Sequence, residues 1–239
     1  MKRVNGLIQR TALYIALTLL WGPVLVAVLS SFNDGRQALV WRGLSLRWYA
    51  ELFGNPVFLN SLRTTLTVAS LTALSATALG GTLALAINRS GQRPGRYAQV
   101  ALAIPLVLPD IVVGISSRAW YSFLHLPLGW WTVYLAHTGF AAAFAYFVIA
   151  ARLNKYNFEL ESAAADLGAR PPRILLTVTL PALAPSIAAA TLLCFTLSLD
   201  DTVVALFTNG AGSPVLSVVL FSLTRLGVSP LMNALATVL

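Results

Sequence analysis

The stretch that decides the fold covers residues 158–181 and reads FELESAAADLGARPPRILLTVTLP. It lies between two long uncharged runs and carries the charges that those runs lack. Its first half predicts a short helix, because Asn157 can cap the start, and Glu159 and Glu161 stand where the helix dipole favours anions. One face of this helix is apolar at helical spacing, through Leu160, Ala164 and Leu167.

Gly168 predicts the end of this helix in a left-handed conformation. Pro171 and Pro172 then fit the first turn of a second short helix, which runs into an apolar segment at Leu180-Pro181. Two short helices around a glycine turn make a compact knob, a name kept here for residues 158–181. Three alanines leave one face of the knob open to a partner, and the second helix presents Ile174, Leu175 and Val178.

The spacing within the knob resembles the cytoplasmic EAA loop of binding-protein-dependent ABC importer permeases. That family's pattern is Glu-Ala-Ala, three residues, Gly, nine residues, Ile, one residue and Leu-Pro, and the spacing matches from Ala163 to Pro181. Two letters differ, because Ser162 stands in place of glutamate, directly after Glu161, and Val178 in place of isoleucine. The alternative is a generic interhelical loop with an amphipathic turn. The resemblance implies ATPase coupling through Glu161, Ser162, Ala163, Ala164, Asp166, Gly168, Val178, Leu180 and Pro181.

The composition of the chain predicts that most of its surface faces lipid. Of 239 residues, 57% are hydrophobic and only 10% are charged, whereas soluble domains carry about 25% charged residues. The net charge of +8 does not indicate nucleic acid, because the basic residues stand singly or in small groups between apolar runs. Cys194 lies within an apolar run and predicts packing. The sequence shows no metal-ligand cluster or phosphate loop, so we expect no cofactor bound by this chain.

The apolar runs predict an all-α, polytopic membrane protein with five full transmembrane helices and the start of a sixth. Pro105, Pro109 and Asp110 interrupt the third helix. Residues 34–56 are polar and aromatic, which is typical of a segment along the outer interface. We read the first helix as retained and the chain as incomplete at its C-terminus, because the sixth run is too short to cross. The expected helices are 11–33, 64–88, 97–117, 131–151 and 181–199, followed by the partial run 228–239.

The basic residues predict the topology and the domains. With the N-terminus in the cytoplasm, ten of them lie inside and six outside, which agrees with the positive-inside rule. The domains are then 1–56, with the first helix and the outer segment, and 57–239, the permease domain, with its cytoplasmic loop at 153–181. The inner residues are Lys2, Arg3, Arg10, Arg89, Arg93, Arg96, Arg152, Lys155, Arg170 and Arg173, and the outer ones are Arg36, Arg42, Arg47, Arg63, Arg118 and Arg225.

Three carboxylates, Asp110, Asp200 and Asp201, are the candidates for a substrate pathway. A carboxylate at membrane depth costs at least about 2.5–3.5 kcal/mol unless it faces water or a partner. These acids therefore either line a path for a cationic substrate or are solvated at the interface and paired with Arg63 or Arg118.

For the remaining polar and aromatic candidates, the sequence favours a structural role over a role in proton transfer, metal binding or substrate binding. His125 and His137 lack the spacing of a metal site, which favours core or interfacial packing over a proton or metal role. Trp120 and Tyr121, like Trp130 and Trp131 nearby, predict interface anchors, with stacking on a substrate amine as the alternative.

Three further sequence segments resemble the corresponding segments of polyamine permeases: SFNDGR, LSLRWYAELFGNP and FTLSLDD. The resemblance implies a type I ABC importer permease fold, a MetI-like helical bundle, in the second permease subunit of a spermidine/putrescine importer of the bacterial inner membrane. It also implies a second permease, two ATPase subunits that use ATP and Mg, and an external binding protein, with no catalysis by this chain. The alternatives are a permease for iron, phosphonate or thiamine, an intramembrane enzyme such as a serine protease, and a membrane anchor that does not transport.

Overall fold

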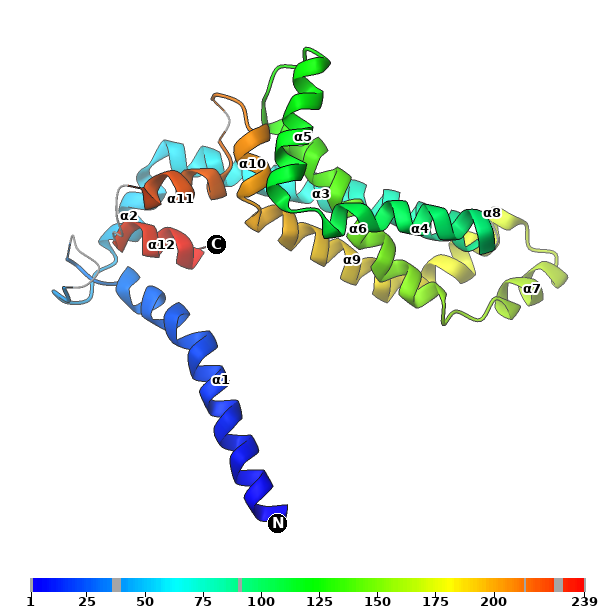
Figure 1. Ribbon diagram of the computed structural model, residues 1–239, viewed down its shortest axis with the longest axis horizontal. Helices are drawn as coiled ribbons and strands as arrows, with labels where there is room; N and C mark the ends of the chain where they lie inside the picture. Colours follow the sequence, from blue (N-terminus) through cyan, green and yellow to red (C-terminus); the bar gives the residue numbers. More distant parts are fainter. Residues whose placement is uncertain (1, 36–39, 90–91, 213, 226–229, 239) are drawn as a thin grey trace. The chain divides into compact units, whose positions relative to one another are not determined.

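The computed structural model describes residues 2–35, 40–89, 92–212, 214–225 and 230–238. Regular structure in these ranges is helical, apart from an isolated bridge between Asn33 and Leu44. Arg36, Ser213, Val228 and Ser229, on which parts of the topology depend, lie outside the described residues. Figure 1 labels α1 (Lys2–Ser31), α2 (Arg47–Gly54), α3 (Pro56–Arg89), α4 (Gln92–Val107), α5 (Asp110–Phe123), α6 (Trp130–Leu153), α7 (Glu159–Asp166), α8 (Pro171–Ile174), α9 (Leu180–Asp200), α10 (Val203–Thr208), α11 (Leu216–Thr224) and α12 (Pro230–Val238), and a π-helix η1 (Leu175–Thr179) lies between α8 and α9.

The chain divides into two compact units, residues 1–60 with 219–239 and residues 61–218. In the first unit α12 contacts both α1 and α2. Asn33 is fully buried and organises the segment before α2, because its side-chain oxygen accepts the Arg42 N–H at 2.8 Å and its carbonyl accepts Trp48 Nε1–H at 2.7 Å. Trp48, expected at a lipid interface, is thus buried within the chain.

In the second unit α6 is the central helix, because it contacts α4, α5, α9 and α10. Its small residues pack against those of α3 in a core that includes Ala76, Ala141 and Ala145. The closest approach is at Gly80, where a Cβ atom would lie 2.6 Å from the Ala142 carbonyl oxygen. The small residues of the second span therefore serve helix packing, as is general for helices in lipid.

The expected third helix is interrupted at its prolines, as predicted, and α4 and α5 meet there at an angle of 104°. The break lies at Leu108 and Pro109, where Pro109 is extended with a ψ of 139°. A proline disfavours the helical conformation of the residue before it and has no N–H to continue the ladder. Asp110 then begins α5, where the helix dipole favours an acid.

The other expected spans correspond to α1, α3, α6 and α9, and these four helices are long and apolar enough to cross a membrane. The prediction of five full spans holds if the bent pair of α4 and α5 counts as one. None of the apolar window of α1 is buried within the chain. Most of the observed helices extend beyond the predicted bounds, most of all at the starts of α1, which begins at Lys2, and of α3, which begins at Pro56.

We expect Gly80→Ala to destabilise the protein, because the added methyl group would overlap the backbone of α6. Overpacking of this kind costs about 1–3 kcal/mol. Gly139→Ala in α6 is the matched control, because its Cβ would meet nothing within 4 Å. Thermal unfolding in detergent should show a lower midpoint for Gly80→Ala only, and equal midpoints would contradict the close packing of α3 and α6.

Candidate functional site

The first half of the knob is the predicted helix, α7. Asn157 caps it as expected, with its side-chain oxygen accepting the Glu159 N–H at 3.0 Å. Gly168 ends it with a φ of 83°, the predicted left-handed conformation. The Ala169 N–H then bonds back to the Ala164 carbonyl at 3.1 Å, which satisfies a carbonyl that the helix end leaves free.

The second half of the knob continues without a break into the long helix α9. Pro171 and Pro172 form the first turn of α8, as predicted, after Arg170 in an extended conformation. A π-helix, η1, follows, in which the Leu180 N–H bonds to the Leu175 carbonyl. This π-helical turn was not predicted from the sequence. Its physical reason is the proline that follows Leu180, whose ring would clash with the carbonyl four residues earlier in a regular α-helix.

The apolar side chains in the first half of the knob face outward, whereas Ile174 in the second half, predicted to be presented to a partner, is buried in the chain. Leu160 is 52% exposed and Leu167 is 89% exposed, while α7 buries no residue. Ser162 and Ala163 are exposed and Ala164 is half-buried. Exposed leucines beside small residues form a surface suited to contact with a partner.

Glu161 differs from the rest of α7, because its carboxylate turns toward the spans. It accepts a hydrogen bond from Thr179 Oγ1 at 2.7 Å, and its other oxygen lies 3.0 Å from Arg89 Nη2 at the end of α3. The remaining predicted residues of the motif lie around it, with Val178 and Leu180 half-buried and Asp166 and Pro181 exposed.

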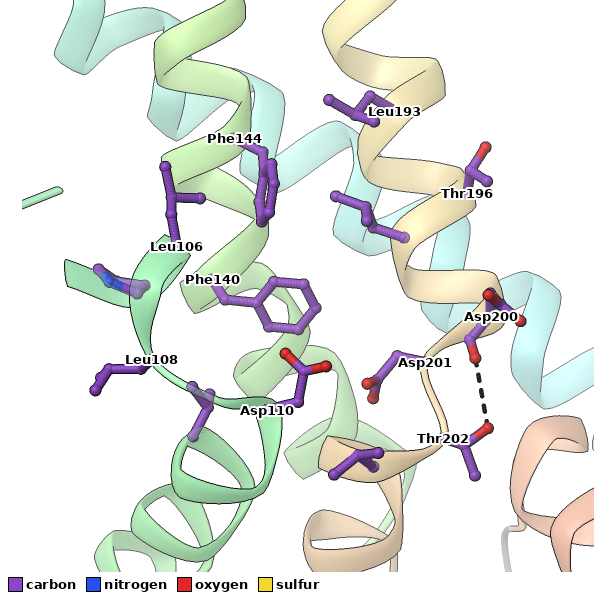
Figure 2. Close-up of a pocket in the computed structure, with 14 residues that line it drawn as sticks. Leu106, Leu108, Asp110, Phe140, Phe144, Leu193, Thr196, Asp200, Asp201 and Thr202 are labelled. Atoms are coloured by element: carbon purple, nitrogen blue, oxygen red, sulfur yellow. Dashed lines mark hydrogen bonds between the residues drawn. The ribbon is translucent and has the colours of Figure 1, made fainter. Parts of the chain in front are cut away.

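A cavity of about 590 Å³ brings the three predicted carboxylates together. Asp110 comes from the start of α5, Asp200 from the end of α9, and Asp201 from the residue that follows (Figure 2). Leu106, Phe140 and Phe144 supply apolar walls, so the cavity combines acids with aromatic and aliphatic surface. Its other lining residues are Pro105, Leu108, Val113, Leu193, Thr196, Leu197, Thr202 and Val203.

Asp201 is the cavity carboxylate that accepts hydrogen bonds from within the protein. Its oxygens accept the backbone N–H groups of Val204 at 3.4 Å and Ala205 at 3.0 Å, which caps α10. One oxygen also lies 2.9 Å from Nε2 of the buried His137, whose Nδ1 lies 2.8 Å from Ser198 Oγ. The hydrogen bond of this histidine is therefore with Ser198, whereas Nε2 lies close to the Asp201 carboxylate without hydrogen-bond geometry.

Ser198, His137 and Asp201 are the residue types of a serine hydrolase, but the arrangement is closed to a substrate. Ser198 is 4% exposed and His137 is 1% exposed, so the hydroxyl cannot reach a reacting group. His137 is a core histidine, as the sequence predicts, but its hydrogen bond with Ser198 of α9 and its close approach to Asp201 were not predicted. His137 and Ser198 are 61 positions apart, so the sequence carries no local signal for their contact.

Asp110 and Asp200 are both exposed, and neither forms an ion pair among the residues described. Figure 2 shows the Asp200 backbone carbonyl bonded to Thr202, at 3.4 Å, which leaves its carboxylate free. The predicted alternative of pairing with Arg118 does not occur, because Arg118 donates to the Phe207 carbonyl at 3.1 Å. Arg63 lines a separate small hollow with Thr64, Thr67 and Trp130.

The aromatic candidates lie outside the cavity lining. Trp120 is 58% exposed and stacks on Phe123, with ring centroids 5.9 Å apart. Tyr121 is buried in a cluster with Ala136 and Val204. The structure therefore places neither ring where it would stack on a molecule in this cavity.

Comparison with known proteins identifies the family. Residues 76–239 match the family described as "Binding-protein-dependent transport system inner membrane component". The chain belongs to this family. It is thus an integral component of the inner membrane, as the apolar spans predict, and the resemblance of the chain to binding-protein-dependent permeases is confirmed.

Two relatives of this family member carry polyamine names. The putrescine transport system permease protein PotI of Escherichia coli (strain K12) is 38% identical over 234 residues, covering 95% of this chain and 83% of the relative. The spermidine/putrescine transport system permease protein PotC of Haemophilus influenzae is 35% identical over 232 residues, covering 97% of this chain and 90% of the relative. Both are named as permeases, the class that the sequence predicts.

Solved structures confirm the fold. A bacterial ABC transporter involved in the import of the acidic polysaccharide alginate matches with a TM-score of 0.74 and 17% identity, covering 98% of this chain and 88% of that one. The inward-facing MetNI methionine ABC transporter matches with a TM-score of 0.65 and 16% identity, covering 75% and 86%. The all-α, MetI-like permease fold is therefore correct.

We expect Asp201→Ala to destabilise the protein and Asp200→Ala to leave its stability almost unchanged. Loss of the Asp201 carboxylate leaves two N–H groups of α10 without their acceptor and removes the charge that lies 2.9 Å from the buried His137, at a cost of about 1–3 kcal/mol. The neighbouring Asp200 substitution removes no such bond and should stay within about 0.5 kcal/mol. Thermal unfolding in detergent measures both, and equal losses would show that Asp201 has no special structural role.

Proposed function

We propose that this chain is one of the two membrane subunits of an ATP-driven importer for polyamines such as putrescine and spermidine. The observation that carries the proposal is the pair of unpaired carboxylates, Asp110 and Asp200, on one cavity of a chain whose net charge is +8. The polyamine names of the two relatives support the same substrate class.

Polyamines carry several positive charges, so they need a wet path with compensating negative charge. An opposite charge at about 4 Å stabilises a cation by about 4 kcal/mol at an effective dielectric constant near 20. Two free acids therefore lower the barrier for an amine without trapping it. The apolar walls at Phe140 and Phe144 suit the methylene segments between the amines of such a substrate.

The same acids argue against an anionic substrate such as a phosphonate, which they would repel. Thiamine and iron carry positive charge, and direct transport measurements separate them from polyamines. A permease for thiamine or for iron is therefore the alternative function that is compatible with an acidic cavity.

The knob supplies the surface through which ATP hydrolysis would drive this chain. Its exposed Leu160 and Leu167 lie beside small residues, and Gly168 sets the turn between its helices. In the proposed assembly, two ATPase subunits bind ATP and Mg, a second permease completes the pathway, and an external binding protein delivers the substrate. In this proposal the knob and the N-terminus lie in the cytoplasm, which the positive-inside bias of the basic residues supports.

The cavity acids provide the first test. In the reconstituted importer, Asp110→Asn and Asp200→Asn should each reduce uptake of labelled putrescine and spermidine, and the double variant should reduce it further. Each lost pairing is worth at least about tenfold in uptake if it contributes 1.4 kcal/mol or more.

Glu51→Gln is the control, because Glu51 is an exposed acid of α2, away from the cavity lining. ATPase assembly should stay normal in all of these variants, since the amides keep the shape of the acids. Unchanged polyamine uptake by the double variant would show that the cavity is not part of the transport path. Uptake of thiamine or iron, but not of polyamines, by the unmodified importer would show that the substrate assignment is wrong.

The turn at Gly168 provides the second test. Gly168→Val should weaken association with the ATPase, because a β-branched residue is strongly disfavoured at a φ of 83°. Gly168→Asn is the matched control, since asparagine tolerates this conformation and a Cβ there meets nothing within 4 Å.

Co-purification of the ATPase measures the effect. Both variants should insert into the membrane normally, because Gly168 lies outside the spans. Equal recovery of the ATPase with Val and with Asn would show that the shape of this turn does not matter for docking.

A further inference from the structure

The first helix of the knob, α7, is not held in place by hydrophobic burial. It buries no residue, and its apolar side chains face outward. Its helix contacts are with α8 and η1, which belong to the same knob. The position of α7 relative to the spans therefore depends on polar contacts.

Glu161 supplies those contacts. Its side chain is only 19% exposed, and both of its oxygens are used. Oε2 lies 3.0 Å from Arg89 Nη2, while Oε1 accepts from Thr179 Oγ1 at 2.7 Å and from Arg89 at 3.3 Å. Arg89 is the last residue of α3 and Thr179 the last of η1, so one carboxylate joins three elements.

An ordinary surface ion pair would contribute almost nothing, and Arg89 is half-exposed. The hydrogen bond with Thr179 contributes more than the ion pair, because Thr179 is fully buried. Removal of Glu161 would leave the Thr179 hydroxyl without its acceptor. Glu159 in the same helix provides the contrast: it is exposed, and its side chain bonds only to Asn157, at 3.3 Å.

Glu161 is also distinct from the acid that the EAA pattern places one residue later. Adjacent residues of a helix point about 100° apart. Ser162, at that later position, is exposed, whereas Glu161 is turned toward Thr179. The carboxylate of Glu161 is therefore occupied inside the chain and not offered to a partner.

We infer that Glu161 is the positioning residue of energy coupling: through Arg89 and Thr179 it fastens α7 to α3 and to the start of α9. A displacement of the knob is then transmitted to α9, which runs from Leu180 to Asp200 at the cavity (Figure 1). The inference rests on the proposed function, in which an ATPase docks on the knob. The name latch is kept here for the contacts of Glu161 with Arg89 and Thr179. Without the latch, the ATPase would displace α7 without displacing α3 and α9.

The test uses the complete complex of both permeases, two ATPases and binding protein in proteoliposomes. Thr179→Val removes the hydroxyl at constant shape, and Thr179→Ser retains it. Glu161→Ala and Arg89→Ala each break the ion pair, and the double variant Arg89→Glu with Glu161→Arg restores it in reverse.

We expect the molecules imported per ATP hydrolysed to fall at least about fivefold in Thr179→Val, Glu161→Ala and Arg89→Ala, since coupling between linked sites is at least this large. Thr179→Ser should match the unmodified complex, and the charge reversal should recover only part of the loss, because it restores the ion pair but not the acceptor of the Thr179 hydroxyl. A residue with a merely structural role would lower complex yield without this pattern of rescue. Glu159→Gln and Arg152→Ala, two exposed positions, are the matched charge controls.

A second measurement follows α7 itself. A spin label at Ala163→Cys, with the buried Cys194 replaced by alanine, should become more mobile in the three damaging variants, stay normal in Thr179→Ser and be partly restored by the charge reversal. Unchanged mobility and an unchanged import ratio in Thr179→Val and Glu161→Ala would overturn the latch. Failure of the unmodified complex to import polyamines would instead overturn the proposed function, and the label mobility alone would still decide whether Glu161 holds α7.

Discussion

The close contact between α3 and α6 is the constraint on which the structure of residues 61–218 depends. Lipid tails are as apolar as leucine, so helices in a membrane associate through close packing of small residues rather than through a hydrophobic driving force. Gly80 lets α3 reach the backbone of α6 at Ala142 and Tyr146. Because α6 also contacts α4, α5, α9 and α10, it holds in place the helices that carry the cavity acids.

The helix α9 connects the knob with the cavity. Its 21 residues correspond to a length of about 30 Å, comparable to the hydrocarbon core of a bilayer. It begins after the π-helix that precedes Pro181 and ends at Asp200, beside the cavity. One helix therefore has the proposed coupling surface at its start and a free carboxylate at its end.

The three cavity acids look equivalent in the sequence, yet burial divides them. Asp201 caps α10 and meets His137, which Ser198 holds from the other side, so this acid stabilises the wall of the cavity. Asp110 and Asp200 stay free on the same cavity. A buried carboxylate needs several donors, whereas an exposed one keeps its charge available to a ligand, so adjacent residues can take different roles.

The sequence by itself determined the membrane class, the main spans and the knob, because these depend on local signals: uncharged runs, a capping asparagine, the left-handed Gly168 and prolines at a helix start. The acids could be selected as candidates because charge is rare in apolar runs. Only the tertiary structure decided the 104° break between α4 and α5, the buried bonds of His137 and the pairing of Glu161 with Arg89. Those bonds join residues 61 to 72 positions apart, and no local pattern encodes which distant helices will meet.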